Sequence, residues 1–155
     1  MLKTIISGAQ TGVDRGALDA ALEAGFPCGG SCPSGRRAED GAIPSSYPVT
    51  ELSSRDYRVR TERNVMDADG TLIVFFGELS GGTRETLRIC EAAGKPVLTI
   101  DGAVKDVALA AVEAAVFIRH NGIGILNVAG PRESSYPGAA DYAKRLIRAV
   151  LTSTP

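Results

Sequence analysis

Short apolar runs alternate along the chain with longer segments in which apolar residues recur at helical spacing. Uninterrupted apolar runs are typical of strands buried on both faces, and here they are Thr4–Ile6, Thr71–Phe76, Pro96–Ile100 and Ile123–Val128. Helical spacing predicts helices at Val13–Ala24, Ser53–Asp67, Arg84–Ala93, Lys105–Arg119 and Gly138–Leu151. This alternation predicts a Rossmann-like, doubly wound α/β fold of about five mostly parallel strands, one of them short and within residues 26–29.

The segment between residues 26 and 50 differs from the rest of the chain. It is rich in Gly, Pro, Ser and charged residues and has little periodicity. A connection of this length in a compact chain usually carries function. The total length of 155 residues and the hydrophobic content of 44% predict a single ligand-binding domain, residues 1–155, with one core.

The charge balance limits the possible partners. The net charge of −1 lacks the basic excess of a nucleic-acid binder, so an anion site has to be local. The odd cysteine count of 3, with no framework spacing, favours reduced thiols and a cytoplasmic protein. The longest apolar stretch, Val107 to Ile118, contains Glu113 and is too short to span a bilayer, so no membrane partner is expected.

Three glycine-containing polar motifs follow predicted strands: "GAQTG", "GELSGGT" and "NVAGPRES". Ligands of doubly wound sheets bind beyond the carboxyl ends of the strands, so these motifs are expected to share one rim. Free N–H groups and the positive end of the dipole favour an anion at a helix start. Each Gly-Thr motif also fits an ordinary turn in which Thr11 or Thr83 is the N-cap, and both interpretations stay open.

The loop "CPSGRRAEDGAIP" places two arginines where a phosphate or carboxylate could be bound. We expect one of Arg36 and Arg37 to face the ligand and the other a carboxylate; the alternative is that both are solvated or paired with Glu39 and Asp40. Cys32 could be reactive or contact a soft metal, but packing is favoured and no metal site is predicted.

No catalytic residue can be assigned from the sequence, and His120 is expected to be structural or solvent-facing. A general base could be any of several carboxylates near the predicted rim. These are Asp14, Glu39, Asp40, Glu62, Glu85 and Glu133.

The motifs "ISGAQTGVDRGALDAAL", "GGSCPSGRRAEDGAIP", "RTERNVMDAD", "LSGGT" and "LNVAGPRES" occur in the order found in the molybdenum carrier family, whose members are related to the molybdenum-cofactor carrier. The chain resembles this family from about Lys3 to Leu151. The resemblance implies a homo-oligomer that binds the molybdenum cofactor (molybdopterin), a phosphorylated pterin whose dithiolene holds molybdate. By matching position, it implies binding by Gly8, Gln10, Thr11, Gly12, Asp14, Arg15, Cys32, Gly35, Arg36, Arg37, Asp40, Thr61, Glu62, Asn64, Gly81, Gly82, Thr83, Asn127, Gly130 and Arg132.

The chain departs from the family pattern at three positions. Ala9 replaces a glycine, and Ser31 and Ser34 stand where the pattern has a tryptophan and a lysine, which weakens any claim of pterin stacking there. More distantly, "SGGTRET" is similar to the "GGxGTxxE" signature of nucleotide phosphoribohydrolases. Thr86 occupies the position of their glutamate, and Glu85 is one residue off, or about 100° around a helix.

The leading hypothesis is a carrier or binding protein rather than an enzyme. Its ligand would be a small phosphorylated anion: the molybdenum cofactor, or otherwise phosphate or a nucleotide. The alternative is a hydrolase that cleaves the N-glycosidic bond of a nucleoside monophosphate. A nucleotide-sensing module without catalysis is a third possibility, which the sequence does not separate from the first.

Overall fold

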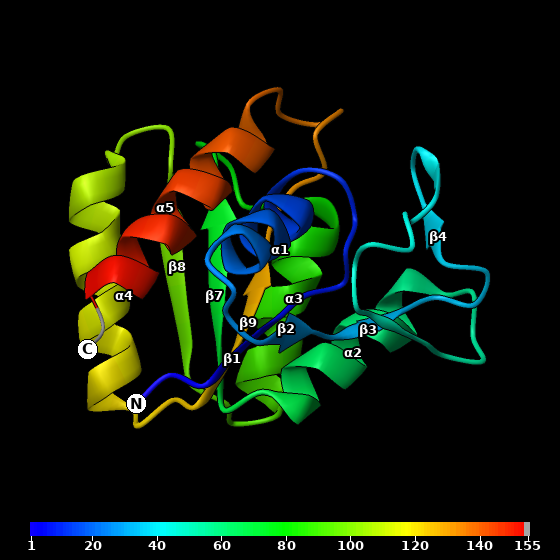
Figure 1. Ribbon diagram of the computed structural model, residues 1–155, viewed down its shortest axis with the longest axis horizontal. Helices are drawn as coiled ribbons and strands as arrows, with labels where there is room; N and C mark the ends of the chain where they lie inside the picture. The colour runs from blue at the N-terminus through cyan, green and yellow to red at the C-terminus, as the bar shows by residue number, and fades with distance from the viewer. Residues whose placement is uncertain (154–155) are drawn as a thin grey trace.

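A five-stranded parallel sheet forms the centre of the computed structural model, which describes residues 1–153 (Figure 1). Its strands lie in the order β2-β1-β9-β7-β8, and every pairing is parallel. The strands are β1 (Thr4–Ile6), β2 (Cys28–Gly29), β7 (Gly70–Phe75), β8 (Val97–Asp101) and β9 (Ile125–Ala129). The predicted Rossmann-like sheet, including the short strand within residues 26–29, is confirmed.

Five helices cover the two faces of this sheet. They are α1 (Val13–Glu23), α2 (Tyr57–Asp67), α3 (Gly81–Ala92), α4 (Val107–His120) and α5 (Ala139–Ser153). Helix α5 packs between α1 and α4 on one face, and α2 and α3 pack together on the other (Figure 1). The main core lies between the first face and the sheet, where Ile5, Leu72, Leu126 and Ile147 are fully buried. None of the helices within residues 1–153 is long and apolar enough to cross a membrane.

The predicted start of α2 at Ser53 is wrong. The N-cap is Asp56, whose carboxylate accepts a hydrogen bond of 2.8 Å from the N–H of Arg58. The hydroxyl of Ser54 accepts from the N–H of Asp56, so the residues before the cap form an extended lead-in rather than a helical turn. A carboxylate at the cap also complements the positive helix terminus, which explains why the helix begins there.

The two Gly-Thr motifs do not use threonine as the N-cap. Helix α1 is capped by Gly12, and the hydroxyl of Thr11 instead donates to the carboxylate of Glu39. Helix α3 is capped by Ser80, so Thr83 lies inside its first turn. Both predicted caps, Thr11 and Thr83, are therefore wrong. In α1 the glycine after Thr11 is itself the N-cap, and in α3 two glycines fill the first helical positions before Thr83.

Strand order brings three loops to one end of the sheet. The chain leaves β1 toward β2 and leaves β7 toward β8 on the opposite side, and β9 returns between β1 and β7. The loops that follow β1 and β9 touch so closely that a Cβ on Gly12 would lie 2.3 Å from the carbonyl oxygen of Pro131. Gly12 also has a φ of 82°, so only glycine fits this position without strain. The loops after β1 and β9 thus meet backbone to backbone at the carboxyl ends of the strands, where the shared rim was predicted.

Residues 26–50 form an ordered lobe rather than an open loop. Strand β3 (Ser31–Cys32) pairs with β6 (Thr50–Glu51), and β4 (Arg37–Ala38) forms a hairpin with β5 (Gly41–Ala42). Figure 1 shows this lobe beyond the β2 edge of the sheet. A second, smaller core joins the lobe to the β1–α1 region; it is made of Ala9, Leu18, Cys32, Ala38, Ile43 and Val49.

Candidate functional site

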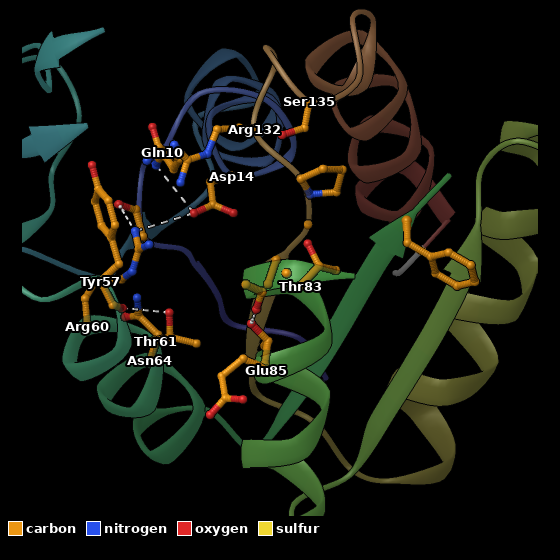
Figure 2. Close-up of a pocket in the computed structure, with 18 of the residues that line it drawn as sticks. Gln10, Asp14, Tyr57, Arg60, Thr61, Asn64, Thr83, Glu85, Arg132 and Ser135 are labelled. Carbon is orange, nitrogen blue, oxygen red and sulfur yellow. Dashed lines mark hydrogen bonds and ion pairs between the residues drawn. The ribbon is translucent and has the colours of Figure 1, made fainter. Parts of the chain in front are cut away.

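A cavity of about 290 Å³ lies at the carboxyl ends of β1, β7 and β9 (Figure 2). Its walls come from the loops after these strands and from the starts of α2 and α3. This is the topological switch point, where ligands of doubly wound sheets bind. The lining residues are Gly8, Gln10, Asp14, Tyr57, Arg58, Arg60, Thr61, Asn64, Phe75, Glu78, Ser80, Gly81, Gly82, Thr83, Glu85, Thr86, Asn127, Val128, Ala129, Gly130, Pro131, Arg132 and Ser135.

One wall of the cavity is the start of α3. The side chain of its N-cap, Ser80, makes no capping hydrogen bond, and the first turn contains no acidic residue. The first N–H groups of a helix have no partner within the helix. Gly81, Gly82 and Thr83 all line the cavity, and their N–H groups have no protein acceptor among residues 1–153. A Cβ on Gly82 would meet nothing within 4 Å, so this terminus is open to a ligand. The geometry suits an anion.

The start of α1 is different, although its sequence looks alike. The N–H of Val13 donates to the carbonyl of Pro131 at 3.2 Å, and that of Arg15 donates to the carbonyl of Gln10 at 3.1 Å. These donors are satisfied by the protein itself. The motif "GAQTG" before α1 therefore supplies side chains that line the cavity. The motif "SGGT" at α3 supplies backbone N–H groups that have no protein acceptor within residues 1–153.

A buried ion pair forms the wall opposite α3. Asp14 and Arg60 are only 7% and 8% exposed, and the Asp14 Oδ2 lies 3.8 Å from the Arg60 Nη1. That nitrogen also donates to the carbonyl of Gly8 at 2.9 Å. A Cβ on Gly8 would lie 2.0 Å from Nη1, so this arginine requires glycine above it.

Asp14 titrates far from its usual range. Burial raises its pKa from 3.8 to about 6, although the charge of Arg60 and the N–H groups of Gln10 and Gly8 lower it. Folding therefore takes up a proton between about pH 4 and 6, and the ionised carboxylate costs stability above that window. Figure 2 shows the carboxyl group directed into the cavity. Asp14 can change its charge near neutral pH in contact with a ligand.

Gln10 carries an unpaired buried donor. Its Oε1 accepts hydrogen bonds from the N–H groups of Thr11, at 3.0 Å, and Glu39, at 2.9 Å. These two contacts orient the amide, and they leave its buried Nε2 without a partner within the described part of the chain. An unmatched buried donor costs about 1–3 kcal/mol, so Nε2 is suited to an acceptor supplied by a ligand.

Tyr57 lines the cavity and has three arginines around its ring, of which Arg60 and Arg132 also line the cavity and Arg37 does not. The guanidinium carbons of Arg37, Arg60 and Arg132 lie 4.4, 5.4 and 5.7 Å from the centre of the Tyr57 ring. Arg132 is also 3.9 Å from the carboxylate of Glu39. The ring thus gathers positive charge beside the cavity.

The structure brings together many, but not all, of the residues expected to bind the ligand. Those that line the cavity are Gly8, Gln10, Asp14, Thr61, Asn64, Gly81, Gly82, Thr83, Asn127, Gly130 and Arg132. Those outside its lining are Thr11, Gly12, Arg15, Cys32, Gly35, Arg36, Arg37, Asp40 and Glu62. The second group lies mainly in the lobe of residues 26–50 or on the surfaces that contact it.

Arg15 and Arg36 have structural partners instead. Arg15 forms a two-pronged ion pair with Asp40, at 2.5 and 2.8 Å, so it meets the lobe while its neighbour Asp14 meets the cavity. Arg36 donates to the carbonyls of Ile43, Pro44, Tyr47 and Val49. Arg37 donates to the carbonyl of Arg55, and neither Arg36 nor Arg37 forms an ion pair with a carboxylate within residues 1–153.

The thiols and the histidine lie apart from the cavity. Cys32 is fully buried in the small core, and burial raises the pKa of its thiol. His120 is the last residue of α4 and is exposed, as expected. The described residues include no group of three or more His, Cys, Asp or Glu side chains that could hold a metal ion.

Several lining residues were not predicted as binding residues. They are Tyr57, Arg58, Arg60, Phe75, Glu78, Ser80, Glu85, Thr86, Val128, Ala129, Pro131 and Ser135. The family resemblance placed Thr61, Glu62 and Asn64 of α2 at the site, but nothing in the sequence indicated that Tyr57, Arg58 and Arg60 of the same helix also line it. Glu85 lies one residue before the position of the glutamate in the hydrolase signature, and Thr86 lies at that position. Both residues nevertheless line the cavity.

Comparisons with known proteins identify the family. The model of the circularly permutated YpsA SLOG family (cpYpsA) matches residues 5–151, so the chain belongs to this family. A crystal structure from Syntrophus aciditrophicus SB, named "Putative molybdenum carrier protein", is 41% identical, with a TM-score of 0.94 over 97% of this chain and 95% of that one. The resemblance to the molybdenum carriers is thereby confirmed. No curated protein matches the chain.

Replacing Arg36 by alanine is expected to destabilise the lobe of residues 26–50. Its four carbonyl acceptors lose a charged donor, which should cost about 2–4 kcal/mol in the free energy of unfolding. Chemical denaturation measures this loss, and limited proteolysis should show faster cleavage between residues 33 and 50. Arg37→Ala is the control, with an expected loss below about 1 kcal/mol. Equal stability of the two variants would contradict the structural role of Arg36.

Proposed function

We propose that this member of the circularly permutated YpsA SLOG family binds a small phosphorylated ligand in the cavity, with the phosphate on the N-terminus of α3. The observation that carries the proposal is the open set of N–H groups at Gly81, Gly82 and Thr83. A helix start without a side-chain cap or an acid in its first turn favours a multiply charged anion. Arg60 and Arg132, which line the cavity, add to this preference.

The rest of the cavity suits a polar heterocycle attached to that phosphate. The unpaired Nε2 of Gln10 can donate, and the Asp14 carboxyl can accept or, when protonated, donate. A volume of about 290 Å³ is near the lower limit for ligand sites, which favours a compound with one heterocycle over a dinucleotide.

The molybdenum cofactor is the first candidate for this ligand, because the 41% identical relative is named a molybdenum carrier protein. Its phosphorylated pterin matches the donors just described. No cysteine is among the residues that line the cavity in the described chain. The metal would then be held by the cofactor's own dithiolene, and this chain would bind the phosphate and the pterin. Phosphate alone or a nucleotide would use the same contacts.

A second candidate is hydrolysis of a nucleoside monophosphate. It is favoured by two carboxyl groups on the cavity walls, Asp14, whose pKa is about 6, and Glu85. Thr86 argues against it, because a threonine at the position of the hydrolase glutamate cannot act as that acid or base. In such a reaction water adds to the sugar carbon as the N-glycosidic bond breaks, and an acid protonates the departing base. Incubation with AMP distinguishes the two functions. Free adenine and ribose 5-phosphate, lost in Asp14→Asn, would favour the enzyme, whereas stable binding of intact AMP favours the carrier.

Gly82→Asp is expected to abolish anion binding without harming the fold. Its Cβ has open space, and an acid in the first helical turn complements the dipole, so the melting temperature should stay equal or rise. The same carboxylate would occupy and repel the phosphate position. Titration calorimetry with inorganic phosphate and AMP should show a dissociation constant raised at least about tenfold. Gly82→Ala is the matched control and should bind nearly as wild type; unchanged binding by the aspartate variant would refute the phosphate position.

The affinity for an anion of constant charge should depend on the protonation of Asp14. Sulfate keeps its charge between about pH 5 and 8, and it is repelled by ionised Asp14 but not by the neutral acid. Because the pKa is about 6, affinity should rise as the pH falls from about 8 and level off below about 6. The total change should be about tenfold. Asp14→Asn keeps the acceptor and should remove this dependence; a flat profile in the wild type would count against a contact between Asp14 and the anion.

A further inference from the structure

Two side chains on one wall of the cavity keep hydrogen-bonding capacity that the protein does not use. They are Gln10 and Asp14, which lie side by side across the cavity from Thr83 of α3 (Figure 2). Each is only 7% exposed, so a ligand in the cavity is the partner best placed to meet them. A ligand that satisfies such buried groups gains affinity, and one that leaves them unpaired is rejected.

The amide of Gln10 has only a donor to offer. Its Oε1 accepts from the N–H groups of Thr11 and Glu39, at 3.0 and 2.9 Å, and a backbone N–H cannot accept a hydrogen bond. These two contacts hold the amide in one orientation and leave Nε2 as the atom without a partner within the described chain. A carbonyl oxygen on the ligand would supply the missing acceptor.

The carboxylate of Asp14 has acceptor capacity to spare. Its Oδ2 accepts a long hydrogen bond of 3.4 Å from the N–H of Gln10 and lies 3.8 Å from Nη1 of Arg60. A carboxylate has about four acceptor sites, so two long contacts leave room for more. Two adjacent N–H groups on a ligand can be accepted side by side by such a group.

The neighbouring polar side chains of α2 are taken up by the protein itself. Asn64 accepts from the N–H of Ser31 at 2.8 Å and donates to its carbonyl at 3.0 Å. The hydroxyl of Thr61 donates to the carbonyl of Tyr57 at 2.9 Å. Asn64 and Thr61 line the cavity, yet their polar groups hold the fold together. The pattern offered to a ligand on this wall is therefore a fixed amide donor beside a carboxylate.

We propose that this wall recognises a guanine-type ring edge, in which a carbonyl, a ring N–H and an amino group stand side by side, and rejects adenine. The carbonyl would accept from Nε2 of Gln10, and ionised Asp14 would accept from the ring N–H and the amino group. Adenine has a ring nitrogen in place of that N–H, so it offers the carboxylate its one amino group. The inference rests on the proposed function, because the phosphate of the same ligand occupies the N-terminus of α3.

The test is the order in which related phosphates bind. Titration calorimetry at about pH 8, where Asp14 is ionised, compares ribose 5-phosphate, AMP, IMP and GMP. GMP should bind at least about tenfold more tightly than AMP, and IMP, which lacks the amino group, should fall between them. Equal affinities for GMP and AMP, with ribose 5-phosphate bound, would overturn the edge and leave the phosphate position standing. Failure of all four to bind would overturn both.

Pterins present the same edge as guanine, so a second comparison identifies the source of the ring. Neopterin monophosphate and GMP should both bind more tightly than AMP. A tighter complex with GMP assigns the site to a guanine nucleotide, whereas a tighter complex with neopterin monophosphate assigns it to a pterin. Two compounds that both bind no better than AMP would contradict the edge.

Asp14→Asn and Gln10→Glu test the two residues separately. Asparagine replaces one acceptor by a donor, so the preference for GMP over IMP should fall to about one. Glutamate still accepts from the N–H groups of Thr11 and Glu39 but has no donor at the position of Nε2, so the preference for IMP over AMP should be lost. Because each readout is a ratio, an effect on the shared phosphate cancels. A ratio that survives its substitution would refute that contact.

Glu62→Gln is the matched control for the loss of a carboxylate. Glu62 is exposed and lies outside the cavity lining, so both ratios should equal those of the wild type. Binding of ribose 5-phosphate by each variant establishes that the cavity is folded. If Asp14→Asn does not fold, Gln10→Glu and the comparison of the four ligands in the wild type still decide the proposal.

Discussion

The buried pair of Asp14 and Arg60 connects the two faces of the sheet. Asp14 belongs to the first turn of α1, whereas Arg60 extends from α2 on the other face and reaches the β1–α1 loop below Gly8. Two charges held out of water require each other, since removal of either partner leaves an uncompensated buried charge. The pair thereby holds α2 against the β1–α1 loop, and the cavity exists because these elements are held together.

The same interaction explains the chemistry of the cavity. Arg60 lies too far from Asp14, at 3.8 Å, to offset the cost of burial fully, so the pKa of Asp14 stays high. The result is a wall in which Asp14 is ionised mainly above about pH 6 beside the permanent charge of Arg60, and this wall faces a helix terminus that prefers anions. A ligand that is negative at α3 and polar near Gln10 and Asp14 would match both walls.

The sheet and its helices could be predicted from the sequence because they follow from periodicity, as in the buried runs at Thr4–Ile6 and Gly70–Phe75. The ends of the helices were less predictable. Ser53 and Asp56 offered competing caps for α2, and only the extended lead-in decided between them. The lobe of residues 26–50 has strands of two residues each, which are too short to give a periodic signal in the sequence. Arg36 stabilises this lobe by donating to four carbonyl groups at separate positions along it, and such contacts cannot be predicted from the local sequence.

Two similar glycine motifs at the candidate site differ in a way that their local sequences do not predict. "GAQTG" and "SGGT" look alike, yet β9 lies next to β1, and Pro131 at its end satisfies a donor of α1. Among residues 1–153, no strand end does the same for α3, whose first N–H groups have no protein acceptor there. Strand order therefore decides which of the two similar glycine motifs keeps N–H groups without a protein partner within residues 1–153.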